Sequence, residues 1–136
     1  TTLTPAEVAL ERRRWLDDGA LDELELAEAY RHMSIERLVE VLEQGVDAAT
    51  RRAPSPVLTH GAPRLSCLRG ESGQATGFVD WEHAAFGDRH RDLSIALASI
   101  VADLAPAFLP VFLDAYGEHV DALQLDWYAL AAELTP

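Results

Sequence analysis

The sequence predicts a mostly α-helical α+β domain with one small β-hairpin. Apolar residues recur at helical spacing in the first third of the chain and again after residue 90. Between these stretches, short apolar runs alternate with glycine-containing turns, which is typical of strands and hairpins. The length of 136 residues suits one folding unit, so we expect residues 1–136 to form a single domain.

Three helices are expected in the first third of the chain. Residues 4–7, Thr-Pro-Ala-Glu, have the pattern of a capping box, which predicts a helix over residues 5–16. Residues 21–32 are a second helical candidate, because leucine and alanine recur on one side. Ser34 is a suitable N-cap for a third helix, whose wide apolar stripe extends to Val46.

The middle of the chain is predicted to be extended. Pro54 and Pro56 end the third helix, because proline interrupts helices and favours extended neighbours. Residues 57–59 are then expected to form a short strand. Residues 67–80 are expected to form a β-hairpin that turns at residues 70–73, Gly-Glu-Ser-Gly.

Helical spacing returns in the last third. Apolar residues at residues 91–104 recur every three or four positions, which predicts a helix packed against a large surface. Two more helices are expected, at residues 106–116 and at residues 123–134.

The formal net charge of −12 limits the classes of partner. Sequence-independent nucleic-acid binding needs a surplus of basic residues, so no nucleic-acid partner is expected. The charge is compatible with a cationic partner or substrate, and equally with solubility alone. Six acidic residues near the N-terminus are interpreted as a solvated helix face: Asp17, Asp18, Asp22, Glu23, Glu25 and Glu28.

Neither a membrane segment nor a secretory signal is expected. The longest apolar stretch, residues 95–113, is interrupted by Ser99, Asp103 and two prolines. The first residues contain no basic region followed by an apolar run. Cys67 is the only cysteine, so no intrachain disulfide is possible, which favours a reducing, cytoplasmic location.

Residues 57–93 carry the pattern that points to chemistry. Residues 57–62, before the hairpin, are Val-Leu-Thr-His-Gly-Ala. Residues 77–82 are Gly-Phe-Val-Asp-Trp-Glu, and residues 86–93 are Phe-Gly-Asp-Arg-His-Arg-Asp-Leu. This order resembles the aminoglycoside phosphotransferase and choline kinase family. In that family the order along the chain is an apolar strand, His-Gly-Asp, an asparagine, a hairpin, a strand ending in aspartate, and then Gly-Asp-x-x-x-Asp-Leu.

The resemblance implies a protein-kinase-like fold, of which this chain would be the C-terminal lobe. It also implies a transferase that moves the γ-phosphate of ATP to a small-molecule hydroxyl with the help of Mg²⁺. Asp80, at the end of a strand, would be a metal ligand, and Glu82 would add a second oxygen ligand directly or through water.

Four further motif residues would have structural roles by the same resemblance. Asp92 would hold the loop that contains His60 and Gly61 through hydrogen bonds. His60 would connect this loop to the strand that carries Asp80, and Asp88 would cap the turn before the following helix.

Two positions depart from the family pattern. Ala62 stands where the family has the aspartate that accepts the substrate proton, and Cys67 stands where it has a metal-binding asparagine. A methyl group accepts no proton, and a thiol is a poor ligand for Mg²⁺. Loss of a general base typically lowers the rate by about 10²–10⁴-fold. The sequence therefore assigns no catalytic residue, because position 62 is degenerate.

The segment before residue 57 is expected to be helical, without a glycine-rich phosphate loop or a strand lysine for ATP. The nucleotide-binding N-lobe is therefore expected to be absent from residues 1–136. Binding of ATP and Mg²⁺, which the resemblance implies, is accordingly doubtful for this chain by itself.

Three functional hypotheses follow. The first is a degenerate or split phosphotransferase lobe for a cationic or hydroxyl-bearing small molecule, inactive alone, with a partner chain supplying the N-lobe. The second is a non-catalytic binding module of the pseudokinase type. The third is a metal-dependent enzyme that uses an acidic and histidine cluster: Asp80, Glu82, His83, Asp88 and His90.

Overall fold

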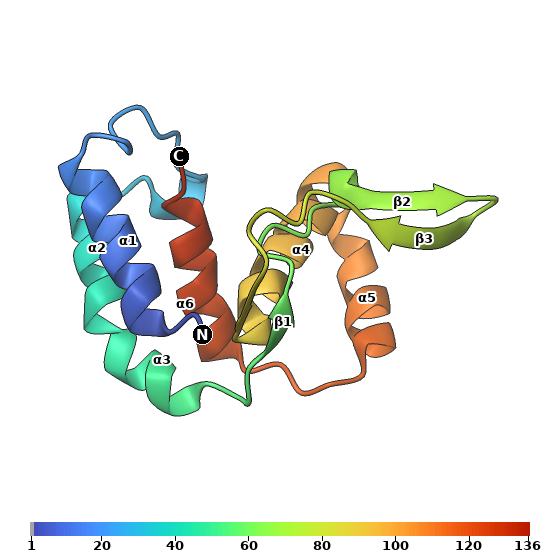
Figure 1. Ribbon diagram of the computed structural model, residues 1–136. Coiled ribbons are helices and arrows are strands. Elements are labelled where there is room, and N and C mark those ends of the chain that lie inside the picture. Colours follow the sequence, from blue (N-terminus) through green and yellow to red (C-terminus); the bar gives the residue numbers. More distant parts are fainter. Residues whose placement is uncertain (1) are drawn as a thin grey trace.

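The structure is a computed structural model that describes residues 2–136. Figure 1 shows a helical body from which a β-hairpin projects beside a further helix. The predicted α+β fold, mostly helical with a small hairpin, is confirmed. The helices are α1 (Pro5–Asp17), α2 (Ile35–Gln44), α3 (Val46–Arg52), α4 (Arg89–Asp103), α5 (Leu109–Tyr116) and α6 (Ala122–Glu133). Short 3₁₀ helices are η1 (Glu28–Tyr30), η2 (Leu65–Cys67) and η3 (Pro106–Phe108).

The helical body is held together by an apolar core between α1, α2 and α6. The capping box at the start of α1 is present as predicted, because Glu7 N–H donates to Thr4 Oγ1 (3.2 Å) and Thr4 N–H donates to Glu7 Oε2 (2.9 Å). The apolar stripe that begins at Ser34 faces the core. Its fully buried members are Leu38, Val39 and Leu42. They form one core cluster with buried residues of α1 and α6: Val8, Ala9, Leu130 and Ala131.

The helix expected at residues 21–32 does not form, and that prediction was wrong. Gly19 adopts φ +77° directly after α1, and turns and an extended run follow up to η1. Leu21 is fully buried, and Leu24 and Leu26 pack against the same core. Leu24 and Leu26 are two residues apart, which suits an extended chain better than a helix. Core packing therefore decides this segment against its helical propensity.

The third predicted helix is divided into α2 and α3 at Gly45. A Cβ atom on Gly45 would lie 2.7 Å from Cδ1 of Trp127 in α6, so only glycine allows this approach. The indole Nε1–H of Trp127 donates to the carbonyl of Leu42 (3.0 Å), which also accepts from the Gly45 N–H (3.2 Å) at the end of α2. Trp127 thus fixes the angle between the N-terminal helices and α6.

Two small antiparallel sheets lie beside the helices. β2 (Leu68–Glu71) and β3 (Gln74–Phe78) form the predicted hairpin, and β1 (Val57–Thr59) is the predicted short strand. The sequence did not predict β4 (Ala85–Gly87), which pairs antiparallel with β1. Leu3 N–H also donates to the Phe86 carbonyl (2.7 Å). These pairings place the loops after β1 and β3 next to the start of α4.

No helix among residues 2–136 is long and apolar enough to cross a membrane.

Candidate functional site

The loop after β1 is held in place by one carboxylate at the start of α4. Asp92 Oδ2 accepts a hydrogen bond from the backbone N–H of His60 (2.7 Å), and Asp92 Oδ1 accepts one from that of Gly61 (2.9 Å). Hydrogen bonds to a carboxylate are stronger than those between neutral groups. The conformation of this loop is therefore tied to the first turn of α4.

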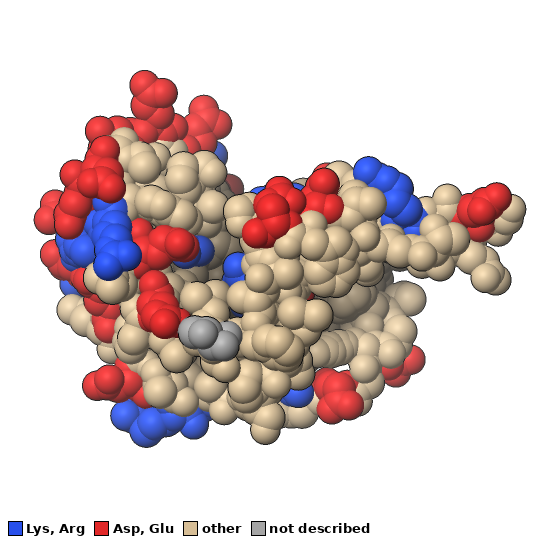
Figure 2. Space-filling model, in the orientation of Figure 1, with Lys and Arg blue, Asp and Glu red and all other residues tan. Residues whose placement is uncertain are grey.

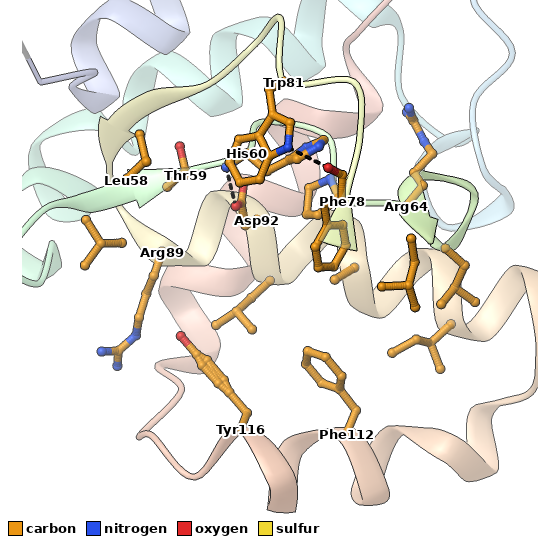
Figure 3. A pocket seen from close by; sticks show the side chains of 17 residues that line it. Leu58, Thr59, His60, Arg64, Phe78, Trp81, Arg89, Asp92, Phe112 and Tyr116 are labelled. Atoms are coloured by element: carbon orange, nitrogen blue, oxygen red, sulfur yellow. Dashed lines mark hydrogen bonds between the residues drawn. The ribbon is translucent and has the colours of Figure 1, made fainter. Parts of the chain in front are cut away.

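His60 connects the same loop to the end of the hairpin. Its Nε2 lies 2.6 Å from the Val79 carbonyl, and its Nδ1 accepts a hydrogen bond from the Ala62 N–H (3.2 Å). Because a carbonyl only accepts and a backbone N–H only donates, the ring carries its proton on Nε2. The indole of Trp81 packs on the imidazole with 4.7 Å between ring centroids, and its Nε1–H donates to the Phe78 carbonyl (Figure 3).

Gly61 has a conformation that other residues rarely adopt. Its φ is +98°, and a Cβ atom would lie 2.5 Å from the carbonyl oxygen of His83. Both the backbone angle and the available space therefore require glycine. The loops that contain residues 60–62 and residues 81–84 are consequently in direct contact.

Ala62, Cys67 and Asp80 come together on one side of this loop. The Sγ atom of Cys67 lies 3.5 Å from the Ala62 carbonyl and 3.9 Å from Oδ2 of Asp80. Cys67 is buried, while Asp80 is exposed. Two sequence-predicted positions and the degenerate one thus share a single site.

The backbone of Asp80 is unusual. Its φ is +64°, a region that few non-glycine residues occupy. Such conformations concentrate at functional sites, where the surrounding structure holds them. β3 ends at Phe78, so Asp80 lies just after the strand rather than within it. Glu82 is exposed in the turn that follows.

Asp88 and His90 lie in a different, buried network. Asp88 caps α4 by accepting from the His90 N–H (2.9 Å), and its Oδ1 also lies 2.7 Å from His90 Nδ1. The Asp121 N–H donates to His90 Nε2 (3.1 Å), so the ring proton is on Nδ1 and points at Asp88. Gln124 in α6 donates to Asp88 Oδ2 (2.6 Å) and to the Ala49 carbonyl (2.8 Å). This network joins α3, α4 and α6.

The same network includes a strong helix cap. Asp121 accepts hydrogen bonds from the N–H groups of Gln124 and Leu123, and these bonds lower the pKa of its carboxyl group. The carboxylate therefore stays charged at the N-terminus of α6, where the helix dipole favours negative charge.

The cluster of Asp80, Glu82, His83, Asp88 and His90 is not assembled into a metal site. Within residues 2–136, no three His, Cys, Asp or Glu side chains are placed to hold one metal ion. Asp88 and His90 are instead engaged with α6.

The residues around Asp80 do not form a good Mg²⁺ site either. An asparagine at position 67 would place an amide oxygen beside Asp80. Cys67 places a thiol sulfur there instead, and Mg²⁺ disfavours sulfur ligands. One exposed carboxylate alone is a poor chelate for this ion. The metal-ligand role expected for Asp80 stays a prediction, and the side chain beside it at position 67 is of the wrong chemical type for Mg²⁺.

Sequence reasoning missed Arg91 and Thr59. Arg91 Nη1 donates to Thr59 Oγ1 (3.0 Å), and both terminal nitrogens donate to the His83 carbonyl. The Thr59 hydroxyl in turn donates to the Ala85 carbonyl (2.7 Å). These contacts join the end of β1 to the loop before β4. No local sequence pattern indicates them, because Thr59 is far from Arg91 and Ala85 along the chain and no periodicity connects Arg91 to His83.

Residues 3–130 match the sequence model of the phosphotransferase enzyme family. This chain belongs to that family. No curated protein matches the phosphotransferase-family chain significantly.

Solved structures show the same kinase-like fold. Aminoglycoside-3'-phosphotransferase of type VIII is 23% identical, with a TM-score of 0.77 over 98% of this chain and 51% of that chain. Aminoglycoside phosphotransferase APH(3'')-Id from Streptomyces rimosus, solved with ADP and streptomycin, is 21% identical, with a TM-score of 0.80 over 98% and 52%. A macrolide 2'-phosphotransferase type I is 15% identical, with a TM-score of 0.56 over 98% and 42%. This phosphotransferase-family chain therefore spans about half the length of the aminoglycoside phosphotransferases it matches.

Proposed function

We propose that this chain is the C-terminal lobe of a phosphotransferase that transfers phosphate from ATP to a small-molecule hydroxyl, and that it is impaired at two positions. The convergence of Ala62, Cys67 and Asp80 carries this proposal. These three residues lie within one site. By the family resemblance they would be the positions of the proton acceptor and of two metal ligands, and only Asp80 would keep a suitable side chain. Loss of the base alone accounts for a rate lower by about 10²–10⁴-fold.

The proposed activity needs a nucleotide-binding lobe, which we propose is supplied by a partner chain. The matched aminoglycoside phosphotransferases are about twice as long as this chain. Trp81 and Phe78, next to Asp80, are 47% and 46% exposed, which is unusual for large aromatic side chains. A second lobe that covers them would bury apolar surface and exclude water from the site. We also propose a cytoplasmic location, because Cys67 is a free thiol, which suits a reducing compartment.

The proposed substrate is a cationic small molecule. The net charge is −12, and Figure 2 shows acidic side chains gathered mostly over the end of the body where α1 and α2 lie. Such a field attracts cations and raises their local concentration. The Streptomyces rimosus enzyme was solved with streptomycin, which supports an aminoglycoside-like substrate by analogy.

A non-catalytic, pseudokinase-type binding module is the second candidate. Ala62 and Cys67 favour it, because both changes remove chemistry while the surrounding hydrogen bonds of His60 and Asp92 remain intact. The two candidates differ in what restoration of the side chains achieves.

The test is a fusion of this chain to the nucleotide-binding lobe of one of its structural relatives, assayed for phosphate transfer to streptomycin. The Ala62→Asp, Cys67→Asn double variant is expected to exceed the unchanged fusion by at least about 10²-fold. The double variant Ala62→Asn, Cys67→Asn is the matched control, because asparagine has the size of aspartate but is not a base. A fusion that binds ATP by calorimetry but gains no rate from Ala62→Asp would favour the binding module.

A further inference from the structure

Residues 105–120, which we call the α5 strap, are held to the body by little burial. They comprise η3, α5 and the loop that leads to α6. None of residues 105–120, all of which the structure describes, is buried, whereas α6 has five buried residues, among them Trp127 and Tyr128. Figure 1 shows α5 standing apart from the helical body, with a long loop that returns to α6. Burial of side chains therefore contributes little to the position of this segment.

The contact between the α5 strap and α4 is also loosely packed. A cavity of about 450 Å³ lies between the two (Figure 3). Leu93 and Ile100 of α4 line one wall, and Phe112 and Tyr116 of α5 line another. Atoms at the edge of a void lack dispersion contacts on one side. Because segments with few buried apolar contacts open locally at a low cost in free energy, the α5 strap has the features of a segment that opens by itself.

The C-terminal end of the α5 strap is fastened to the first turn of α4. Arg89 Nη2 donates to the carbonyl of His119. The backbone N–H of Asp121, directly after the strap, donates to Nε2 of His90 (3.1 Å). Gly117, at φ +75°, ends α5 just before these contacts. Two adjacent residues of α4 thus hold the end of the strap.

The contact between Asp121 and His90 requires a neutral imidazole ring. His90 Nδ1 carries the ring proton and donates to Asp88 Oδ1 (2.7 Å), so Nε2 has the free lone pair that accepts from Asp121. A second proton, on Nε2, would point at the N–H of Asp121, and two donors form no hydrogen bond. Histidine is the side chain that ordinarily changes its charge between about pH 5 and 8. Protonation of this ring therefore removes the contact.

A counter-charge is available to a protonated His90. The ring is only 2% exposed, but the Asp88 carboxylate is in contact with it, so a positive ring would not be isolated in the core. The Asp121 carboxylate is occupied as the cap of α6. A proton on Nε2 thus faces a donor for as long as the strap stays closed. The titratable and charged groups around the ring are Asp88 and Arg89 at the start of its own helix, Arg52 on α3 through Gln124, His119 and Asp121 after α5, and Tyr128 on α6.

We propose that His90 is a pH-sensitive latch for the α5 strap: protonation of Nε2 in mild acid breaks its contact with Asp121, and the strap moves away from α4. The closed form lacks this proton and the open form holds it, so a fall in pH shifts the population toward the open form. The neutral ring stabilises the closed form at higher pH, and this contribution disappears as pH falls through the titration of His90. Opening gives solvent access to the cavity. The latch uses none of Ala62, Cys67 and Asp80, so it does not depend on phosphate transfer.

The test is nuclear magnetic resonance of the 136-residue chain between pH 8 and pH 5. Long-range ¹H–¹⁵N spectra of the His90 ring report protonation of Nε2 and need no substitution. Amide hydrogen exchange reports opening. We expect the protection factors of residues 109–121 to fall at least tenfold at the pH where the His90 ring titrates, while those of α1 and α2 stay constant. Loss of protection in α1 and α2 at the same pH would mean global unfolding and would overturn the proposal.

Two variants separate the latch from other histidines. Glutamine has an N–H donor for Asp88 and an oxygen acceptor for Asp121, and it takes up no second proton. His90→Gln should therefore keep the strap protected down to pH 5. His119→Gln is the matched control, because it removes an exposed ring from the same loop but keeps the carbonyl that accepts from Arg89.

The pH response should remain in His119→Gln. A His90 ring that stays neutral down to pH 5, or one that titrates without a change in residues 109–121, would each contradict the latch. A response that survives in His90→Gln or is lost in His119→Gln would do the same.

Discussion

Asp92→Asn tests how the candidate site is held. Asp92 accepts two backbone hydrogen bonds, from His60 and Gly61, at 2.7 and 2.9 Å. Hydrogen bonds to a charged group contribute about 1.5–3 kcal/mol each. Asparagine keeps one acceptor, without the charge, and turns an NH₂ group toward the other N–H. One bond is lost and the other falls to about 1 kcal/mol, so the free energy of unfolding should decrease by about 2–5 kcal/mol.

Urea denaturation of Asp92→Asn, followed by circular dichroism, measures this decrease as a lower midpoint with an unchanged slope. Amide hydrogen exchange adds the local readout, because the N–H groups of His60 and Gly61 should lose protection before the rest of the chain. Asp114→Asn, exposed on α5, is the matched control and should change stability by less than about 0.5 kcal/mol. A change this small in Asp92→Asn would refute the assigned role.

Three further variants test other parts of the structure. Gly61→Ala should reduce the free energy of unfolding by more than about 3 kcal/mol, because φ is +98° and the His83 carbonyl blocks the new methyl group. In the same urea titration the control Gly117→Ala, at φ +75° but with open space for the methyl group, should reduce it by about 1 kcal/mol. Gln124→Leu should cost about 2–4 kcal/mol, because buried acceptors of Asp88 and Ala49 lose their donor; a loss below 1 kcal/mol would show that this network is dispensable. Burial raises the pKa of Tyr128 above its ordinary value of 10.0, so the folded state holds this proton more tightly and stability should fall as pH rises above 10. Tyr128→Phe should reduce the difference between urea midpoints at pH 9 and pH 11, and an equal difference in both proteins would contradict this assignment.

Local patterns predicted most of the elements of this fold. The capping box at Thr4, the strand at residues 57–59 and the hairpin depend on neighbouring residues, and all three are present. The segment at residues 21–32 was predicted wrongly, because its leucines are fixed by contacts with a distant core. β4 was missed for a related reason: three residues have too short a pattern, and it is stabilised by segments far away along the chain, strand β1 and Leu3.

The candidate site was predictable where motif order sufficed. The sequence placed Ala62, Cys67 and Asp80 in one site, and the structure brings their loops within contact distance. It did not reveal the contacts of Arg91 with Thr59 and His83, since no periodicity connects those positions. It also did not reveal that Asp88 and His90 face α6, because Gln124 lies far along the chain.

The central claim is that positions 62, 67 and 80 form one site in which only Asp80 retains its ligand chemistry. The most direct measurement is broadening of backbone amide signals by Mn²⁺ in the Ala62→Asp, Cys67→Asn double variant. We expect broadening centred on positions 62, 67 and 80, which is much weaker in the unchanged chain and disappears when Asp80→Asn is added. Broadening centred on the acidic residues 17–28, or unaffected by Asp80→Asn, would contradict it.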